Sequence, residues 1–200
     1  MNKKGFLIIF DRRYFIFIGI LFALFFLYDH YDSIGYIQEG STAYDIGNFF
    51  GLQPPDSELI DSYILDLTNQ QRANYELEPL SFDSELSGIA IMHSKDMFDR
   101  DFFDHNNPDG DGPTERARNN GIRIVSGTWI GIGENIGETP IGNVIGCGYV
   151  YDELDVAKCT MDGWMDSPGH RENILNSDSS VIGVGTHCTT SSCFSTQNFR

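Results

Sequence analysis

Apolar residues recur with the 3.6-residue period of an α-helix at two places in the middle of the chain. In the first, Ile60, Ile64 and Leu67 lie on one helical face, and the polar Ser57 before them is a suitable N-cap. The pattern predicts a helix that begins after Ser57 and ends near Tyr75, before a proline.

The second helical stretch is longer and carries a histidine within its apolar face. Asp83 is a suitable N-cap for it, and we expect it to end near Arg100. Because His93 lies on the apolar face, we expect a buried, structural side chain hydrogen-bonded to the backbone. The repeating positions of that face are Leu86, Ala90, His93 and Met97.

Shorter elements follow in the second half of the chain. Helices are expected over 114–120, 156–166 and 169–175, a strand within 122–136, and a hairpin of 181–187 with 194–199. Helices followed by a few late strands predict an α+β domain and not a parallel βαβ array.

The N-terminal region has a different pattern. Residues 14–28 are uncharged and apolar, which is short for a membrane span of about 17–25 residues, but no A-x-A-like cleavage site follows them. We therefore favour an uncleaved membrane anchor or signal-anchor over a cleaved secretory signal. Basic residues precede the run, so 1–13 is predicted to be cytoplasmic. The linker 29–56 and the domain 57–200 would then lie outside the cytoplasm; after signal cleavage they would be secreted.

The charge of the chain limits its partners. The formal net charge is −16, and four of the 13 basic residues precede the apolar run. The remainder is therefore more acidic still and would repel a phosphate backbone, which excludes nucleic acid as an expected partner.

The four cysteines all lie in the last third of the chain. An even number in an exported domain predicts two disulfides, with three pairings open and four free thiols as the alternative. The pairing that closes the shortest loops is Cys147–Cys159 with Cys188–Cys193. No C-x-x-C spacing is present, so a cysteine zinc site is disfavoured.

Candidate chemistry rests on two histidines and one acid. His105, Glu134 and His170 are the residue types that hold Zn²⁺ or a similar divalent ion, and three ligands would leave a position open for water. Their spacing alone does not bring them together. The alternative is that His105 lies in a turn, Glu134 caps a backbone group and His170 is a surface residue of a helix.

Other familiar motifs fail. The acidic run after Asn107 begins like an EF-hand loop, but its last ligand position is Arg118. The pair Gly131 and Gly133 has no third glycine at position 136, so it is not a dinucleotide fingerprint. The chain has no G-x-S-x-G nucleophile elbow.

Taken together, several short motifs resemble the CAP superfamily of cysteine-rich secretory, antigen-five and pathogenesis-related proteins, in its secreted prokaryotic subgroup. The most specific are Phe102-Phe103-Asp104-His105, Gly133-Glu134-Asn135-Ile136 and the run from Trp164 to Leu175. The resemblance implies a three-layer α-β-α sandwich with a small antiparallel sheet. It also implies that His105, Glu134 and His170 meet in a central cleft, and we assign Trp164 a structural role.

The family often places two histidines and two glutamates in this cleft. The position of its second glutamate matches Ser167 here, which weakens any mechanism that needs two carboxylates. Members are associated with divalent metals, lipids or partner proteins, and proteolysis has been proposed for some, so the resemblance does not fix a reaction.

We therefore favour a membrane-tethered binding module that takes a divalent metal, a lipid or an envelope partner outside the cytoplasm. The alternative is a metal-dependent peptide or ester hydrolase in which Glu134 acts as general base. A third possibility is a structural envelope protein whose cleft has no ligand.

Overall fold

The computed structural model describes residues 53–123 and 131–200. These residues all belong to one of the two compact units into which the chain divides, Gly47–Arg200. Within these two ranges, no helix has the length and apolar character needed to cross a membrane. The predicted anchor at 14–28 lies outside the described residues, as does nearly all of the predicted linker.

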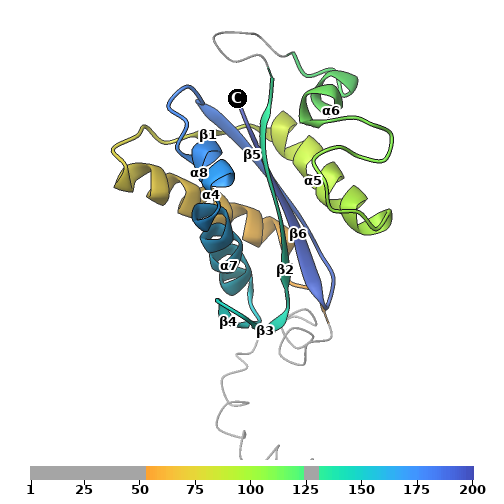
Figure 1. The fold of residues 1–200 in the computed structure, drawn as a ribbon, viewed down its shortest axis with the longest axis vertical. Helices are drawn as coiled ribbons and strands as arrows, with labels where there is room; N and C mark the ends of the chain where they lie inside the picture. The colour runs from red at the N-terminus through yellow and green to blue at the C-terminus, as the bar shows by residue number, and fades with distance from the viewer. Residues whose placement is uncertain (1–52, 124–130) are drawn as a thin grey trace, which may run out of the picture. The chain divides into compact units, whose positions relative to one another are not determined.

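Helices flank a mixed sheet on both sides (Figure 1). Helices α4, α7 and α8 lie on one side and α5 with α6 on the other, which confirms the predicted α+β class. The helices are α4 (Ser57–Asn74), α5 (Ser84–Asp99), α6 (Pro113–Asn119), α7 (Glu153–Asp166) and α8 (Pro168–Ile174).

The main sheet has four strands in the order β1-β5-β6-β2, and a separate hairpin pairs β3 with β4. The strands are β1 (Ser81–Phe82), β2 (Gly133–Pro140), β3 (Gly142–Val144), β4 (Gly148–Val150), β5 (Val181–Cys188) and β6 (Ser192–Phe199). The expected wholly antiparallel sheet needs correction, because β1 runs parallel to β5. This short strand forms where the chain passes from α4 to α5 along the edge of β5, a connection that the helical patterns did not reveal.

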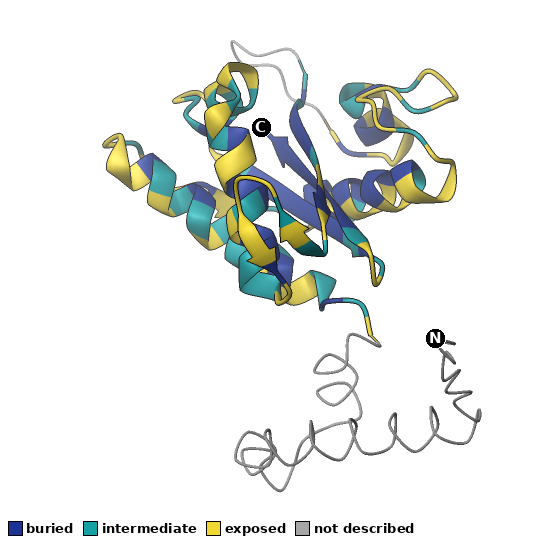
Figure 2. Cartoon of the chain, turned by 60° about the horizontal axis from the view of Figure 1, so that its bottom comes forward, coloured by how far each residue is buried: buried dark blue, intermediate teal, exposed yellow. Residues whose placement is uncertain are grey.

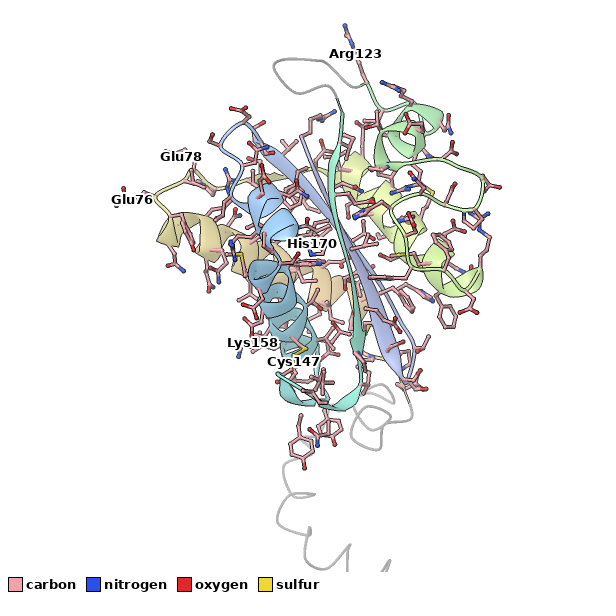
Figure 3. All side chains as sticks on the ribbon, in the orientation of Figure 1. Glu76, Glu78, Arg123, Cys147, Lys158 and His170 are labelled. Carbon is pink, nitrogen blue, oxygen red and sulfur yellow. A yellow bond between two sulfur atoms is a disulfide. The ribbon has the colours of Figure 1, made fainter. Side chains whose placement is uncertain are left out.

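The β5–β6 hairpin is the centre of the fold. Its strands are almost continuously buried, since helices cover both faces (Figure 2). The expected disulfide Cys188–Cys193 joins directly opposed residues at its turn. The other expected disulfide, Cys147–Cys159, ties the β3–β4 hairpin to α7; Figure 3 labels Cys147 near the end of that helix.

Several predicted boundaries move. The N-cap of α4 is Asp56 and not Ser57, because the Asp56 carboxylate accepts the backbone N–H groups of Glu58 and Leu59. Asp83 caps α5 as expected. Of the stretch 122–136, in which a strand was expected, residues 124–130 lie outside the described residues, and β2 begins at Gly133. The β3–β4 hairpin was not anticipated because its strands are too short to show a pattern.

Helix α5 lies directly on the backbone of β5. A Cβ atom added at Gly185 would come within 2.1 Å of the backbone nitrogen of Ile91, and one at Gly183 within 2.2 Å of the backbone of α5. Ser87 and Ser94 of α5 also donate to the carbonyls of Val184 and Gly185. The two glycines therefore set the distance between helix and sheet.

We predict that Gly185→Ala lowers the free energy of unfolding by about 3 kcal/mol or more, because backbone atoms of the helix must move to admit the methyl group. Gly88→Ala in the same helix is the control. Its added Cβ would meet nothing within 4 Å, so it should be neutral or stabilising by about 1 kcal/mol. Urea unfolding of both variants measures the difference, and equal stabilities would contradict this account of the packing.

Asp61 of α4 is a half-buried acid. Burial is the main cause that raises its pKa to about 7, partly offset by a hydrogen bond from Thr186. One carboxylate oxygen, Oδ1, is buried without a hydrogen-bond partner. The folded protein therefore binds a proton at Asp61 more tightly than the unfolded chain does, and this contribution to stability is lost as pH rises from about 4 to about 7.

We predict that Asp61→Asn raises the free energy of unfolding at pH 8 by about 1–3 kcal/mol, and that most of this gain disappears near pH 4.5. Urea titrations at the two pH values measure it. Asp66→Asn, which changes an exposed acid on the same helix, is the control and should show no such pH dependence. A gain for Asp61→Asn that does not vary with pH would refute a buried, protonated carboxyl.

Candidate functional site

Glu134 is the centre of the candidate site. It lies in β2 opposite Asn198 of β6, and its side chain is 1 % exposed. One carboxylate oxygen, Oε2, accepts from the guanidinium of Arg116, and the other, Oε1, accepts from Nδ1 of His105 at 2.9 Å. A charged carboxylate this deeply buried requires such partners, because an unpaired buried charge costs several kcal/mol.

Arg116 joins three segments of the site. From α6, its guanidinium pairs with Glu134 and also donates to the backbone carbonyls of His105, at 2.6 Å, and Asp111, at 2.9 Å. It is only 8 % exposed. One side chain thus fixes both the carboxylate and the loop that carries His105.

His105 is held in one orientation by these contacts. Its Nδ1–H donates to Glu134, so in the neutral ring the lone pair lies on Nε2. The side chain is 47 % exposed, which leaves that nitrogen open to a ligand. The hydrogen bond to Glu134 is the main cause that raises the pKa of His105 above its ordinary value.

His170 reaches the same site from the first turn of α8. Figure 3 shows it on the side of the helix that faces β2. Its backbone carbonyl accepts from the amide of Asn135 at 3.1 Å. Burial is the main cause that lowers its pKa, and the charge of His105 lowers it further.

A chain of amide side chains fixes the helix that carries His170, on the face of the sheet that α4 and α8 cover. Asn173 donates to the carbonyl of Glu134 and to the side chain of Asn135. Asn135 in turn donates to Gln197, which donates to Thr68 of α4. Each link is buried or half-buried, so the position of α8 is fixed by directional contacts and not by apolar packing alone.

The structure confirms that His93 is a buried residue hydrogen-bonded to the backbone, and it also places His93 close to Glu134, which was not expected. It is 1 % exposed and its Nε2 bonds to the carbonyl of Asp104 at 3.1 Å. Since a carbonyl only accepts, Nε2 carries the proton. The same nitrogen lies 3.9 Å from Glu134, and burial is the main cause that lowers the pKa of His93.

The three residues singled out from the sequence thus lie in one region, but not as three equivalent ligands. Both oxygens of Glu134 are occupied by protein donors. Across residues 53–123 and 131–200, no group of three or more His, Cys, Asp or Glu side chains is arranged to hold a metal ion. Arg116 was missed, because one arginine in a short polar helix carries no sequence signal of burial.

A family model matches the chain over residues 65–199, well over half of its length, and is described as the cysteine-rich secretory protein family, or CAP. The chain belongs to this family. The CAP resemblance of the sequence motifs is therefore confirmed, and Glu134 of its Gly-Glu-Asn-Ile segment is the buried acid described above.

Two relatives come from Bacillus subtilis. The uncharacterized protein YkwD is 34 % identical over 132 residues, which cover 66 % of this chain and 44 % of that protein. The uncharacterized membrane protein YlbC is 30 % identical over 139 residues, which cover 70 % of this chain and 34 % of that protein. The match thus spans less than half of either relative.

Solved structures share the fold. An extracellular protein of Bacillus anthracis that contains an SCP domain is 29 % identical with a TM-score of 0.58, over 72 % of this chain and 40 % of that one. An outer surface protein of Borrelia burgdorferi is 16 % identical with a TM-score of 0.56, over 73 % of this chain and 95 % of that one. The second likeness concerns the fold alone.

We predict that Glu134→Gln lowers the pKa of His105, because the substitution removes the negative charge that favours the imidazolium. Titration of the histidine ring protons by NMR measures it. Glu138→Gln, an exposed acid further along β2, is the control and should leave His105 unchanged. A His105 pKa that is the same in the parent and in Glu134→Gln would show that the two side chains are not bonded in solution.

Proposed function

We propose that this CAP domain is an extracytoplasmic binding module that takes a divalent metal such as Zn²⁺ through His105 and His170. The observation that supports this proposal most directly is the hydrogen bond from Nδ1 of His105 to Glu134, which leaves the lone pair of the neutral ring on Nε2, where a metal can bind. A carboxylate that accepts from the far ring nitrogen of a metal-binding histidine is a common supporting arrangement. Glu134 then orients a ligand and is not itself one.

The donor set suits such an ion. Burial and the neighbouring charge lower the pKa of His170, so its ring is neutral and able to bind at neutral pH. Two imidazoles leave the remaining positions to water or to a ligand molecule. A more distant CAP-like structure, NaASP2 at 14 % identity, is described with Zn²⁺, and that observation belongs to that protein.

The extracytoplasmic location rests on three independent features. The disulfides Cys147–Cys159 and Cys188–Cys193 suit an oxidising compartment. The basic residues before the apolar run at 14–28 favour export of the chain beyond that run. One relative is called extracellular and another a membrane protein. Tethering through residues 14–28 is part of the proposal.

The hydrolase alternative finds less support in these contacts. A general base must be within reach of the water that it deprotonates, and the side chain of Glu134 is only 1 % exposed. Both oxygens of Glu134 already accept, one of them from a guanidinium that cannot give up its charge.

Isothermal titration with Zn²⁺ tests the metal proposal on the full chain in a neutral detergent. We expect a saturable heat that is lost in the His105→Ala/His170→Ala double variant, and an affinity about 10–100-fold weaker in Glu134→Gln. His187→Ala, which changes a histidine beside Phe98, is the control and should bind like the parent.

Equal heats for the parent and the double variant would overturn the metal proposal. A screen of peptide and ester substrates separates binding from hydrolysis. Turnover that requires both Zn²⁺ and Glu134 would establish the hydrolase in place of the binding module.

A further inference from the structure

A groove extends from His170 along the outer edge of β2. It has a volume of about 450 Å³, within the range of ligand-binding clefts. Strand β2 forms its floor from Ile136 to Pro140, α7 forms one wall at Gly163 and Trp164, and Phe103 lies on the other side. In Figure 1 this strand crosses in front of β6 and β5, and no helix covers it from that side.

The floor of this groove is the unpaired edge of a sheet. In the described part of the chain, β2 pairs with β6 only and is the last strand in the order. Residues of a strand direct their backbone groups alternately to its two edges. The carbonyls of Glu134 and Ile136 accept from the side chains of Asn173 and Trp164, so the even-numbered residues face outward.

Glu138 is the next residue in that series. Its N–H and C=O therefore face the groove, and the residue is exposed. Beyond it, Pro140 has no N–H to offer. An antiparallel partner strand could exchange both of its hydrogen bonds with Glu138, as residues of a hydrogen-bonded pair do.

The charge of the groove selects the partner. Its lining contains three exposed acids, Glu138, Asp162 and Asp166, and no lysine or arginine. The apolar part of the lining includes Phe103, which is 51 % exposed, and Ile145, which is fully exposed. A segment that carries both basic and apolar side chains complements this surface.

The two kinds of side chain would occupy different walls. Thr139 of β2 faces α7, where it bonds to Thr160, whereas Ile136 faces the opposite side and packs with Met97 and Phe194. Side chains of an added strand alternate in the same way. Basic residues would thus meet Asp162 and Asp166 on α7, and apolar residues would meet Phe103.

We propose that the groove binds an extended segment of a partner protein, with alternating basic and apolar residues, as an antiparallel strand added to the outer edge of β2. Backbone hydrogen bonds supply affinity in this mode, and alternate side chains supply specificity. The inference rests on the proposed role as a binding module and names its partner class, but it does not require the metal.

The probe is a blocked nonapeptide of alternating lysine and valine, titrated against the full chain in neutral detergent and followed by fluorescence anisotropy. In the antiparallel arrangement, the peptide residues whose N–H groups face β2 place their side chains on the Phe103 side. These residues are therefore the valines. N-methylation of the valine amides should weaken binding about tenfold or more, whereas N-methylation of the lysine amides should not.

Variants of Gly163 locate the binding site. A Cβ atom at Gly163 meets nothing within 4 Å, so a side chain there extends into the groove without disturbing α7. Gly163→Leu should weaken the peptide about tenfold, and Gly163→Ala, with one methyl group, should bind nearly as the parent does. Gly163→Leu should also give the far-ultraviolet circular dichroism spectrum of the parent, which shows that it is folded.

The strand-addition proposal is overturned by the absence of peptide binding, by equal affinities of the two methylated peptides, or by a loss confined to the lysine-methylated one. It is also overturned if Gly163→Leu binds the peptide as the parent does. A parent that binds Zn²⁺ but no peptide refutes this inference alone, and one that binds the peptide but no Zn²⁺ refutes the metal proposal alone.

Discussion

The buried carboxylate of Glu134 is the constraint on which the site depends. A charge at 1 % exposure is tolerated only where partners surround it, and those partners come from α6 and from the loop after α5. Because Arg116 also donates a hydrogen bond to the backbone carbonyl of His105, the same side chain both neutralises the acid and positions the imidazole. Loss of the arginine would leave a buried charge and release the loop together.

The central hairpin makes this arrangement possible. Residues of β6 alternate between two covered faces, and each face carries buried polar groups. On one side Thr196 bonds to Ser94 of α5, and on the other Gln197 links Asn135 to Thr68 of α4. Directional contacts of this kind fix the register of the layers, since a small shift would leave several buried donors and acceptors unpaired.

The sequence predicts the parts of this molecule that leave a local pattern, such as the repeat of apolar residues on a helix face or a capping residue before it. The apolar face of α5, the cap at Asp83 and the β5–β6 hairpin follow from local patterns. The two disulfides are the pairing with the shortest loops, one of three that the sequence left open. The convergence of His105, Glu134 and His170 came only from the family resemblance, because no spacing records a meeting of residues so far apart. Arg116 and the Asn135–Gln197 chain were missed, since a side chain that bonds across the fold has no local signature.

The open edge of β2 needs an explanation, because an unpaired strand edge invites aggregation with other copies. Exposed Glu138 and Pro140 are devices that protect such an edge, the first by repulsion and the second by withholding a donor. Their effect is selective. In a chain of net charge −16, a second copy would bring acids against Glu138, Asp162 and Asp166, whereas a basic segment would bring the opposite charge to Asp162 and Asp166. The same residues can therefore exclude self-association and still admit a foreign strand, which is how one edge serves both solubility and recognition.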